Sequence, residues 1–405
     1  MSRYFIQAAD VLFFKDGREV APGSEYSAAS VFPPNPGTIY GALRSCLLSL
    51  NKQADFDKKN FGIANTQIGK IVGTQHKKWT LKLSNFRLGR QTENKYNALF
   101  RLPLDVLQRK KPDYEKGEQD EILCSNLKDR SAIGLKSNAP GSFLKTSWFV
   151  HQEGSFFEHE PAFITENLFY NYLIDDLKTN SDAHSLRDHL LKQIKKPNSD
   201  NQEPFLSEPR MGIVINDESH TVEEAKLFTT PFIRPSKDIG FLIDLNIDSE
   251  HLPDNTKLRL GGDGKIAVLN RIEKHQLRSD NDMRLKKKLT AAETLKLVLT
   301  TPAVFKKGWL PDGIDPDSGK GEMNGVSVTL RGVVLGKYEN LGGWDVSENR
   351  PKMTRRAVPA GSIYYFSTPD PQRAFERLHK QSICAKEDAK QGLGITYIGV
   401  KNNYV

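Results

Sequence analysis

The stretch VFPPNPGTIYGALRS, residues 31–45, follows a strand-like opening, RYFIQAADVLFFKDGR, and decides how the chain begins to fold. Its Pro-Pro-x-Pro run locks φ at each proline and restricts the residues before them, so regular strand pairing ends there. A helix can then start at Gly37, with Asn35 or Thr38 accepting hydrogen bonds from its free N–H groups. The stretch predicts a strand, a rigid loop and a helix, and the loop is either a stiff connector or an anion site.

Apolar and alternating runs in the second half of the chain predict a clear order of elements. The strands are LKLVLTTPAVF (295–305), VSVTLRGVVLGKY (326–338) and SIYYFST (362–368). PQRAFERLHKQS (371–382) has helical spacing, and a glycine turn in GLGITYIGVK (392–401) leads into a last strand. This is the β-α-β-β-α-β order of a ferredoxin-like domain, with a weak or missing first helix around 309–320.

The first half fits the same order if a long insertion is allowed. Residues 3–14 give the first strand, 37–50 the helix, MGIVIN (211–216), LFTTPFI (227–233) and GFLIDLN (240–246) the middle strands, and GGDGKIAVL (261–269) the last strand. We therefore predict an α+β fold with two tandem ferredoxin-like (RRM-like) domains. The first spans residues 1–275 with an insertion at about 60–200, and the second spans 290–405.

Length and composition favour a soluble protein of two domains. A chain of 405 residues exceeds the size at which one core usually stops growing, and 38% hydrophobic residues with 27% charged ones is ordinary for a globular protein. No apolar run is long enough for a membrane span, and the opening residues lack the apolar region of a signal peptide, so we expect a cytoplasmic protein. The cysteines, Cys46, Cys124 and Cys384, are far apart and predict reduced thiols without a metal. We expect no cofactor.

Positive charge is concentrated in one segment. The chain carries a formal net charge of +8, and residues 70–111 hold eleven Lys and Arg against two acids. That segment interleaves aromatic residues with the cations, as in HKKWTLKLSNFRLGRQTENKYNALFR (76–101). Ring faces for base stacking beside cations for phosphates indicate a nucleic-acid partner. The alternative is a solvated insertion whose charge contacts nothing specific.

Two glycine turns are candidates for contact with a phosphate backbone. The first holds Gly261, Gly262 and Gly264 between Arg259 and Lys265; the second holds Gly392 and Gly394. Glycine lets backbone N–H groups approach an anion closely, but a tight turn requires the same residues. Neither turn has the spacing of a P-loop or of a dinucleotide-binding turn, so we expect no nucleotide hydrolysis by this chain.

A basic cluster between prolines is the third candidate. It holds Lys352, Arg355 and Arg356, and Trp344 precedes it. The cations could clamp phosphates while Trp344 stacks on a base, or the cluster could be an exposed turn with Trp344 in the core. Arg44, on the first helix, could meet RNA or form an ion pair inside the protein.

Several blocks of the chain resemble one family in order and spacing. The FPP-x-P loop and GALR helix are similar to the opening of RAMP-type subunits of CRISPR effector complexes, in particular the subunit-three family of the Cmr (type III-B) complex. Further blocks that match are SEPRMGIVIN (207–216), LFTTPFIRP (227–235), LRLGGDGKIAVL (258–269), LTTPAVFKKGWLP (299–311), GGWD (342–345), PKMTRRAVPAGSIYYF (351–366) and GLGITYIG (392–399).

The resemblance implies a function in antiviral defence. It implies a non-catalytic subunit that binds the 5′ tag region of the crRNA and contacts the large polymerase-like subunit and the first backbone subunit. In such proteins a glycine-rich loop after the second helix lies against RNA, which favours the RNA-binding interpretation of both turns.

Two other functions remain open. Related endoribonucleases that process CRISPR RNA share the double ferredoxin-like design, and metal-free RNA cleavage needs a histidine base with an acid partner. No histidine stands just after the first strand or within the FPP loop. His184 and His189 are five residues apart, so they do not share a helix face. We therefore expect no enzyme activity. The third possibility is a protein-binding scaffold whose charge only aids solubility.

Overall fold

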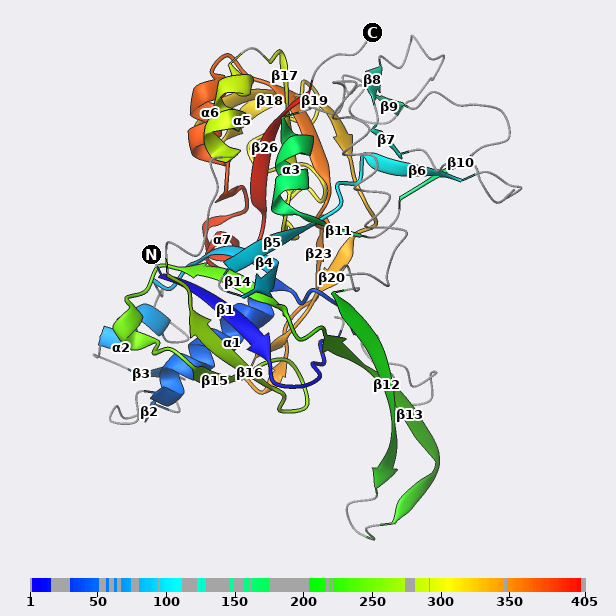
Figure 1. Cartoon of the computed structure of the whole chain (residues 1–405), viewed down its shortest axis with the longest axis vertical. Coiled ribbons are helices and arrows are strands. Elements are labelled where there is room, and N and C mark those ends of the chain that lie inside the picture. The colour runs from blue at the N-terminus through cyan, green and yellow to red at the C-terminus, as the bar shows by residue number, and fades with distance from the viewer. Residues whose placement is uncertain are drawn as a thin grey trace. The chain divides into compact units, whose positions relative to one another are not determined.

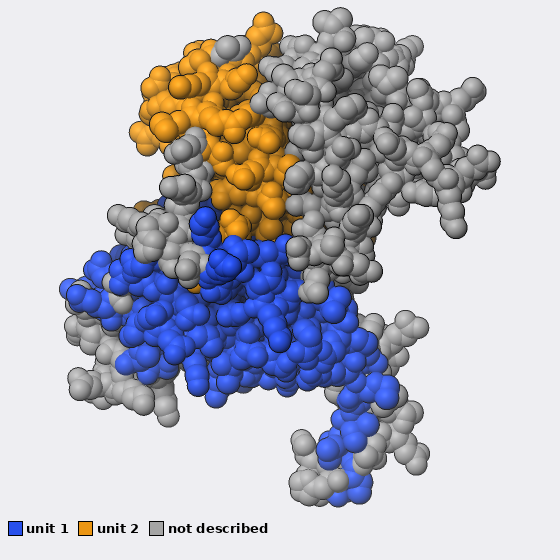
Figure 2. Space-filling model, viewed as in Figure 1, with its two compact units in different colours: residues 1–95, 203–274, 340–356 blue, residues 96–202, 275–339, 357–405 orange. Residues whose placement is uncertain are grey.

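A computed structural model of the chain describes residues 2–15, 30–50, 56–57, 62–63, 67–73, 80–93, 95–110, 122–124, 126–128, 146–148, 156–159, 162–174, 204–215, 219, 221–273, 281–290, 292–345 and 348–401. The chain divides into two compact units, each made of three separate stretches of sequence. Unit 1 comprises residues 1–95, 203–274 and 340–356, and unit 2 comprises residues 96–202, 275–339 and 357–405 (Figure 2).

The main sheet of unit 1 is antiparallel. It contains the run β4-β14-β1-β16-β15, formed by β4 (Leu83–Thr92), β14 (Ile239–Leu245), β1 (Ser2–Ala8), β16 (Ile266–Arg271) and β15 (Thr256–Arg259). Every residue of β14 is buried, so this strand lies in the middle of the core. The helix α1 (Pro36–Leu50) packs against β15 and buries Ile39, Leu43 and Leu47. The predicted strand over residues 3–14 ends early, at Ala8.

The proline loop before α1 is a connector. The Gly37 amide donates to the Asn35 side chain at 2.9 Å, and the Thr38 amide donates to the Asn35 carbonyl at 2.8 Å. Asn35 thus caps the helix. It is one of the two residues, Asn35 and Thr38, that the sequence suggested as acceptors for the first helix amides. The Phe32 ring lies 4.4 Å from that of Phe205 and 5.7 Å from that of Phe241, centroid to centroid. Because the loop packs into the core and the first helix amides have partners, the connector interpretation holds.

A long hairpin takes up two of the runs predicted as middle strands. Among the described strands, β12 (Phe205–Ile215) pairs with β13 (Val222–Pro235) alone, in a separate two-stranded sheet. Figure 1 shows this hairpin extending away from the main sheet of unit 1. The prediction that MGIVIN and LFTTPFI belong to the main sheet is therefore wrong. Their alternating apolar residues look half-buried in sequence, but Met211 is 74% exposed. The strand beside β14 is instead β4, inside the stretch predicted as an insertion.

Unit 2 contains a six-stranded antiparallel sheet that matches the prediction for the second half. Its order is β18-β19-β24-β17-β26-β25, formed by β18 (Lys320–Met323), β19 (Val326–Val334), β24 (Ile363–Ser367), β17 (Thr294–Leu299), β26 (Ile395–Lys401) and β25 (Gln381–Ser382). The helix α6 (Pro371–Leu378) starts at an Asp370 cap, whose carboxylate accepts from the Arg373 amide, and packs on β26.

The helix missing after β17 is replaced by helices from other parts of the chain. Residues 300–319 contain no helix, as predicted for that region. Instead α3 (Glu166–Leu173) and α5 (Asn281–Leu289) both pack against β26. Gly399 permits this approach, because a Cβ there would lie 2.7 Å from the Leu173 carbonyl oxygen. A segment far away in sequence therefore completes the helical layer of unit 2.

Shorter elements make up the rest of the described chain. They are β2 (Phe56–Asp57), β3 (Gly62–Ile63), α2 (Gln67–Val72), β5 (Lys95–Arg101), β6 (Val106–Lys110), β7 (Ile122–Cys124), β8 (Asn126–Lys128), β9 (Thr146–Trp148), β10 (Phe156–Glu158), β11 (Phe163–Thr165), η2 (Ser249–His251), β20 (Glu339–Leu341), β21 (Trp344–Asp345), β22 (Arg350–Pro351), β23 (Arg355–Ala357) and α7 (Lys386–Lys390). The protein is thus a mixture of helices and mostly antiparallel sheets, consistent with the predicted α+β class. No helix in the described part of the chain has the length and apolar character of a membrane span.

Candidate nucleic-acid interface

The glycine turn before β16 is exposed and tightly formed. The Leu260 amide donates to the Lys265 carbonyl at 2.8 Å, which closes the turn, and Gly261 and Gly264 have φ angles of +80° and +61°. A Cβ on Gly261 would collide with the Phe13 carbonyl, whereas a Cβ on Gly264 would meet nothing within 4 Å. Gly261 is therefore required by packing, while Gly264 faces open space.

Cations flank this turn, but one of its amides is already used. Arg259 is exposed, and the Lys265 ammonium lies 3.2 Å from the Asp263 carboxylate. The Gly262 amide donates to the Phe13 carbonyl at 2.8 Å, so it points into the protein. Contact with an anion would therefore involve the exposed backbone at the tip together with the two cations, and at Lys265 the anion would compete with the Asp263 carboxylate.

Two arginines that we did not single out in the sequence lie at the base of the β12–β13 hairpin. The Arg234 guanidinium contacts the Asp10 carboxylate at 2.7 Å and that of Glu208 at 2.5 Å, and Arg210 reaches Glu208 at 2.6 Å. The hydrogen bonds from Arg234 lower the pKa of both carboxyls and raise the pKa of the arginine itself. These groups remain charged at neutral pH.

The Phe232 ring joins the hairpin base to the glycine turn. The Arg210 guanidinium carbon lies 5.1 Å from its centroid, and the Lys265 ammonium lies 4.8 Å from it. Both contacts are in the cation–π range. The sequence does not predict this arrangement, because Arg210 and Lys265 are far apart along the chain. They come together at the ring of Phe232, which lies on β13.

The Trp344 region forms an exposed basic hairpin. Trp344 pairs with Pro351 in the short β21–β22 ladder, and the Lys352 amide donates to the Gly343 carbonyl at 2.9 Å. Trp344 is 54% exposed, so the alternative that places it in the core is wrong. Three cations are exposed around it and Arg355 is half-buried; the exposed cations are Arg350, Lys352 and Arg356. A ring face and several cations are thus open to solvent.

Arg44 serves the interior of unit 1. It is half-buried on α1, and its Nε donates to the Val72 carbonyl at 3.1 Å. Burial lowers the pKa of its guanidinium, while Tyr40 and Asp345 oppose this effect. This hydrogen bond favours an internal role for Arg44, through a backbone carbonyl where the sequence suggested an ion pair, and RNA contact by Arg44 stays a prediction.

The second glycine turn lies inside unit 2. Gly392 and Gly394 are both buried, and their amides donate to the carbonyls of Ala389 (3.2 Å) and Pro302 (2.8 Å). A Cβ on Gly394 would collide with the Cys384 sulfur. These contacts support the tight-turn interpretation, and the amides have no open approach for RNA.

Most of the basic stretch over residues 70–111 that the structure describes is sheet. Phe86 and Phe100 are buried, so their ring faces cannot stack on bases. Arg90 pairs with Asp238 at 2.8 Å, and Arg101 pairs with Glu339 at 3.2 Å. The interleaving of aromatics and charge reflects strands with buried rings. Trp79 lies outside the described residues.

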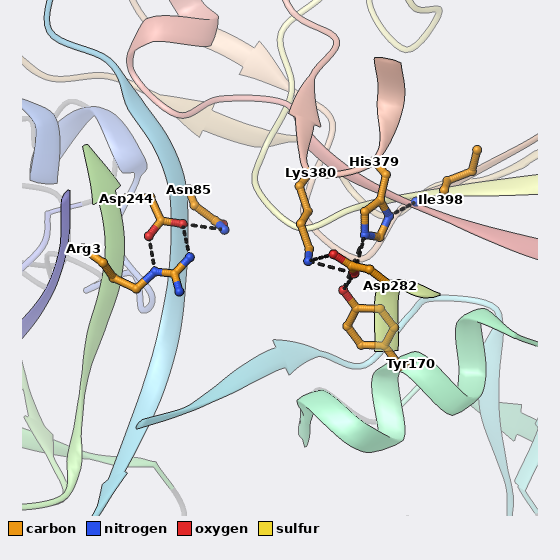
Figure 3. Close-up of polar contacts among 8 residues, drawn as sticks. All are labelled: Arg3, Asn85, Tyr170, Asp244, Asp282, His379, Lys380 and Ile398. Atoms are coloured by element: carbon orange, nitrogen blue, oxygen red, sulfur yellow. Dashed lines mark hydrogen bonds and ion pairs between the residues drawn. The ribbon is translucent and has the colours of Figure 1, made fainter. Parts of the chain in front are cut away.

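Two polar clusters are structural (Figure 3). In unit 1, Arg3 on β1 pairs with Asp244 on β14, which also accepts from Asn85 on β4 at 3.2 Å, so three adjacent strands are linked. In unit 2, Asp282 on α5 accepts from Tyr170 at 2.5 Å, from His379 at 3.1 Å and from Lys380 at 2.6 Å. Neither cluster was predicted from the sequence.

The cluster at Asp282 does not form a general base. His379 is 6% exposed, its Nε2 faces Asp282, and its Nδ1 accepts from the Ile398 amide at 3.4 Å. Because both ring nitrogens have partners inside the protein, no proton can be exchanged with a substrate there. Within the described residues, no group of three or more His, Cys, Asp or Glu could hold a metal ion.

The chain can now be compared with known proteins. The family model of the CRISPR-associated protein Cas_Cmr3 matches residues 4–401. A cryo-EM structure of the Type III-B Cmr-beta bound to cognate target RNA contains a chain with 16% identity, over 90% of this chain and 86% of that one, at a TM-score of 0.47. A second structure of this complex, bound to cognate target RNA and AMPPnP (state 1), contains a chain with 16% identity, over 90% of this chain and 86% of that one, at a TM-score of 0.46. No curated protein matches.

By fold the chain is an α+β protein whose strands are mostly antiparallel. Because the family model covers nearly its whole length, it belongs to the Cmr3 family of CRISPR-associated proteins, which are subunits of type III-B (Cmr) complexes. The family resemblance noted in the sequence is confirmed.

Proposed function

We propose that this chain is a non-catalytic subunit that holds the 5′ tag region of the crRNA within a type III-B complex. In this proposal it also docks the large polymerase-like subunit and the first backbone subunit. The observation that carries the RNA contact is the exposed glycine turn at residues 261–264, flanked by Arg259 and Lys265 and joined through Phe232 to Arg210. The two similar complexes named above were solved bound to cognate target RNA.

The fold part of the proposal is two ferredoxin-like domains, residues 1–275 and 290–405. A ferredoxin-like sheet places its four strands in the order 2-3-1-4. The run β4-β14-β1-β16 has this order in unit 1, and β19-β24-β17-β26 has it in unit 2. A helix follows the first strand in unit 1 (α1) and the third strand in unit 2 (α6). Strand order supports the proposal, although each half keeps only one of the two expected helices.

The chemistry of the contact follows from the groups that are exposed. Arg259 and Lys265 supply positive charge for phosphates, and the glycines let a backbone approach closely. The exposed indole of Trp344 can stack on a splayed base, with Lys352 and Arg356 beside it for phosphates. Arg210 and Arg234 are held by Glu208 and Asp10, so phosphate contact there would compete with carboxylates.

The first test measures binding of a fluorescently labelled, tag-bearing RNA over a salt series. Arg259→Ala with Lys265→Ala should weaken binding by about tenfold and lower the slope of log K against log salt by about 1.4, at roughly 0.7 per phosphate contact. Lys237→Ala with Lys386→Ala, two exposed lysines elsewhere, removes the same charge and is the control. If both pairs behave alike, the turn holds no RNA.

The non-catalytic part has its own test. Purified protein is incubated with repeat RNA without metal, and the products are separated on a denaturing gel. We expect intact RNA, because both ring nitrogens of the buried His379 have partners inside the protein. A clean, site-specific product would show that the chain is a ribonuclease.

A further inference from the structure

The helix α5 presents a row of cations to solvent on the helical side of unit 2. Leu285 and Leu289 are buried, whereas Met283, Arg284, Lys287 and Lys288 are exposed. Residues 284 and 288 are four apart and 284 and 287 three apart, so these cations lie on one face of the helix. We call Arg284, Lys287 and Lys288 the α5 ridge.

The α5 ridge is held in a fixed position. At the start of the helix, Asp282 is bonded to Tyr170 of α3 and to His379 and Lys380 (Figure 3). In the middle, Lys286 pairs with Glu376 of α6 at 3.6 Å. Figure 1 shows α5 and α6 side by side, as their packing requires. The ridge is therefore presented on a firm backbone.

The positive charge of the ridge is not neutralised by described residues. None of its three cations forms an ion pair with a described acid, and the acids on α5 and α6 themselves, Asp282 and Glu376, are engaged by Lys380 and Lys286. On α6, Arg373 and Arg377 are exposed as well. The surface of the two helices thus has excess positive charge.

Helix stability explains only part of this pattern. Cations in a last turn interact favourably with the helix dipole, which accounts for Lys287 and Lys288. Arg284 lies in the first turn, where a cation is unfavourable, and it is exposed without an acid partner among the described residues. Neither the helix dipole nor a described acid therefore accounts for a cation at this position.

We propose that the α5 ridge binds the phosphate backbone of single-stranded RNA, as a second contact surface besides the glycine turn of unit 1. Residues three and four apart on a helix have Cβ atoms about 5–6 Å apart, close to the spacing of successive phosphates along a strand. The ridge offers no aromatic ring, so contact is with the backbone and independent of base identity. An acidic protein surface is the competing partner, and the test separates the two.

The experiment uses a fluorescein-labelled polyuridine RNA of 20 nucleotides, which carries no tag. Its binding to the full chain is measured in a series from low to moderate salt. The variant Arg284→Ala/Lys287→Ala/Lys288→Ala should lose about tenfold in affinity, with a salt slope lower by about 2 at roughly 0.7 per phosphate. The control Lys237→Ala/Lys320→Ala/Lys386→Ala removes the same charge from dispersed exposed sites and should lose far less. Circular dichroism checks that both remain folded.

Three results would overturn the proposal: no binding by the unaltered chain, equal losses in both triple variants, or a ridge variant with unchanged affinity, as an acidic protein partner predicts. The single change Arg284→Lys keeps a cation at this position, so this variant should bind the polyuridine RNA as tightly as the unaltered chain does. Arg259→Ala with Lys265→Ala is measured on the tag-bearing RNA in the same series. Failure at the ridge can then be distinguished from failure of the proposed tag contact at the glycine turn.

Discussion

Gly261 and Gly264 lie three residues apart in one turn, yet the structure uses them differently. Both have positive φ angles. Only Gly261 is pressed against a neighbour, since its Cα faces the Phe13 carbonyl. In sequence the two glycines are indistinguishable, because the neighbour comes from a segment about 250 residues earlier, and only tertiary packing separates a required glycine from an open one.

Substitution should separate the two glycines. Gly264→Ala places a side chain at positive φ without a collision and should cost about 1 kcal/mol of unfolding free energy. Gly261→Ala adds a collision with backbone and should cost about 3 kcal/mol. Urea unfolding monitored by circular dichroism gives both values. Equal losses would contradict the packing role of Gly261.

At the scale of elements, β4 and the β12–β13 hairpin show what pattern reading misses. The apolar residues of β4 alternate with cations, so charge dominated the interpretation of LSNFRLGRQT, although Phe86 and Leu88 are core. In β12 the apolar alternation is real, but Met211, Ile213 and Ile215 are exposed. Periodicity gives which residues share a face, and it does not say whether that face is covered.

Other elements were predictable because local rules and tertiary packing agree. α1 has prolines before it and Asn35 as its cap, and α6 has Asp370 as its cap and Pro371 at its first position. The strands of unit 2 were predicted from continuous apolar runs, which suit strands covered on both faces, as in β26. The sequence pointed to the turn at 261–264 and to the basic hairpin as candidate sites. Arg210 became a candidate only when the structure placed it beside Phe232.

The packing of α5 against α3 and α6 should depend on pH through Asp282. Burial would raise the pKa of this carboxyl, but hydrogen bonds from His379 and Lys380 outweigh burial and lower it. A lowered folded-state pKa gives stability that is full above the unfolded value near 4 and is lost as the pH falls through the folded value. Asp282→Asn should therefore cost about 1–2 kcal/mol at pH 7, reduced by partial exposure, and less at pH 3.

Urea midpoints of the variant and the unaltered protein at pH 7, 5 and 3 check this. The difference in midpoint between Asp282→Asn and the unaltered protein should be the same at pH 7 and 5 and smaller at pH 3. Asp317→Asn, an exposed aspartate whose side chain has no partner among the described residues, is the control and should change little at any pH. A difference that grows as the pH falls would show that the Asp282 carboxylate does not stabilise the fold.

At the scale of the whole molecule, the two units are interleaved in sequence. Each unit draws on three stretches of chain, and unit 2 takes α3 and α5 from before its own sheet. A boundary read along the chain cannot show this, because composition and linkers report on neighbours in sequence and not on packing partners. The prediction that residues 290–405 form a domain rests on the order of their strands. The order of strands does not say whether these residues fold without the rest of the chain.

Residues 290–405 alone should not form a cooperatively folded domain. Tyr397 on β26 is buried here by Phe100, Phe169 and Tyr170, and all three lie outside that fragment. Exposed apolar surface of this kind favours a loosely packed or aggregated state. Near-UV circular dichroism and urea unfolding of the fragment, beside the full chain, test this. A sharp, reversible transition in the fragment would show that α3 and α5 are dispensable.

The replacement of a helix by α3 has a consequence for synthesis. On the ribosome α3 emerges more than two hundred residues before β26, the strand on which it packs. During this interval α3 lacks β26, although Phe169 can already stack on Phe100 of β5, whereas the run β4-β14-β1-β16-β15 of unit 1 is complete once β16 has emerged. Because a waiting apolar segment is prone to aggregate, the speed of translation and the supply of chaperones will affect the yield of unit 2 more than that of unit 1.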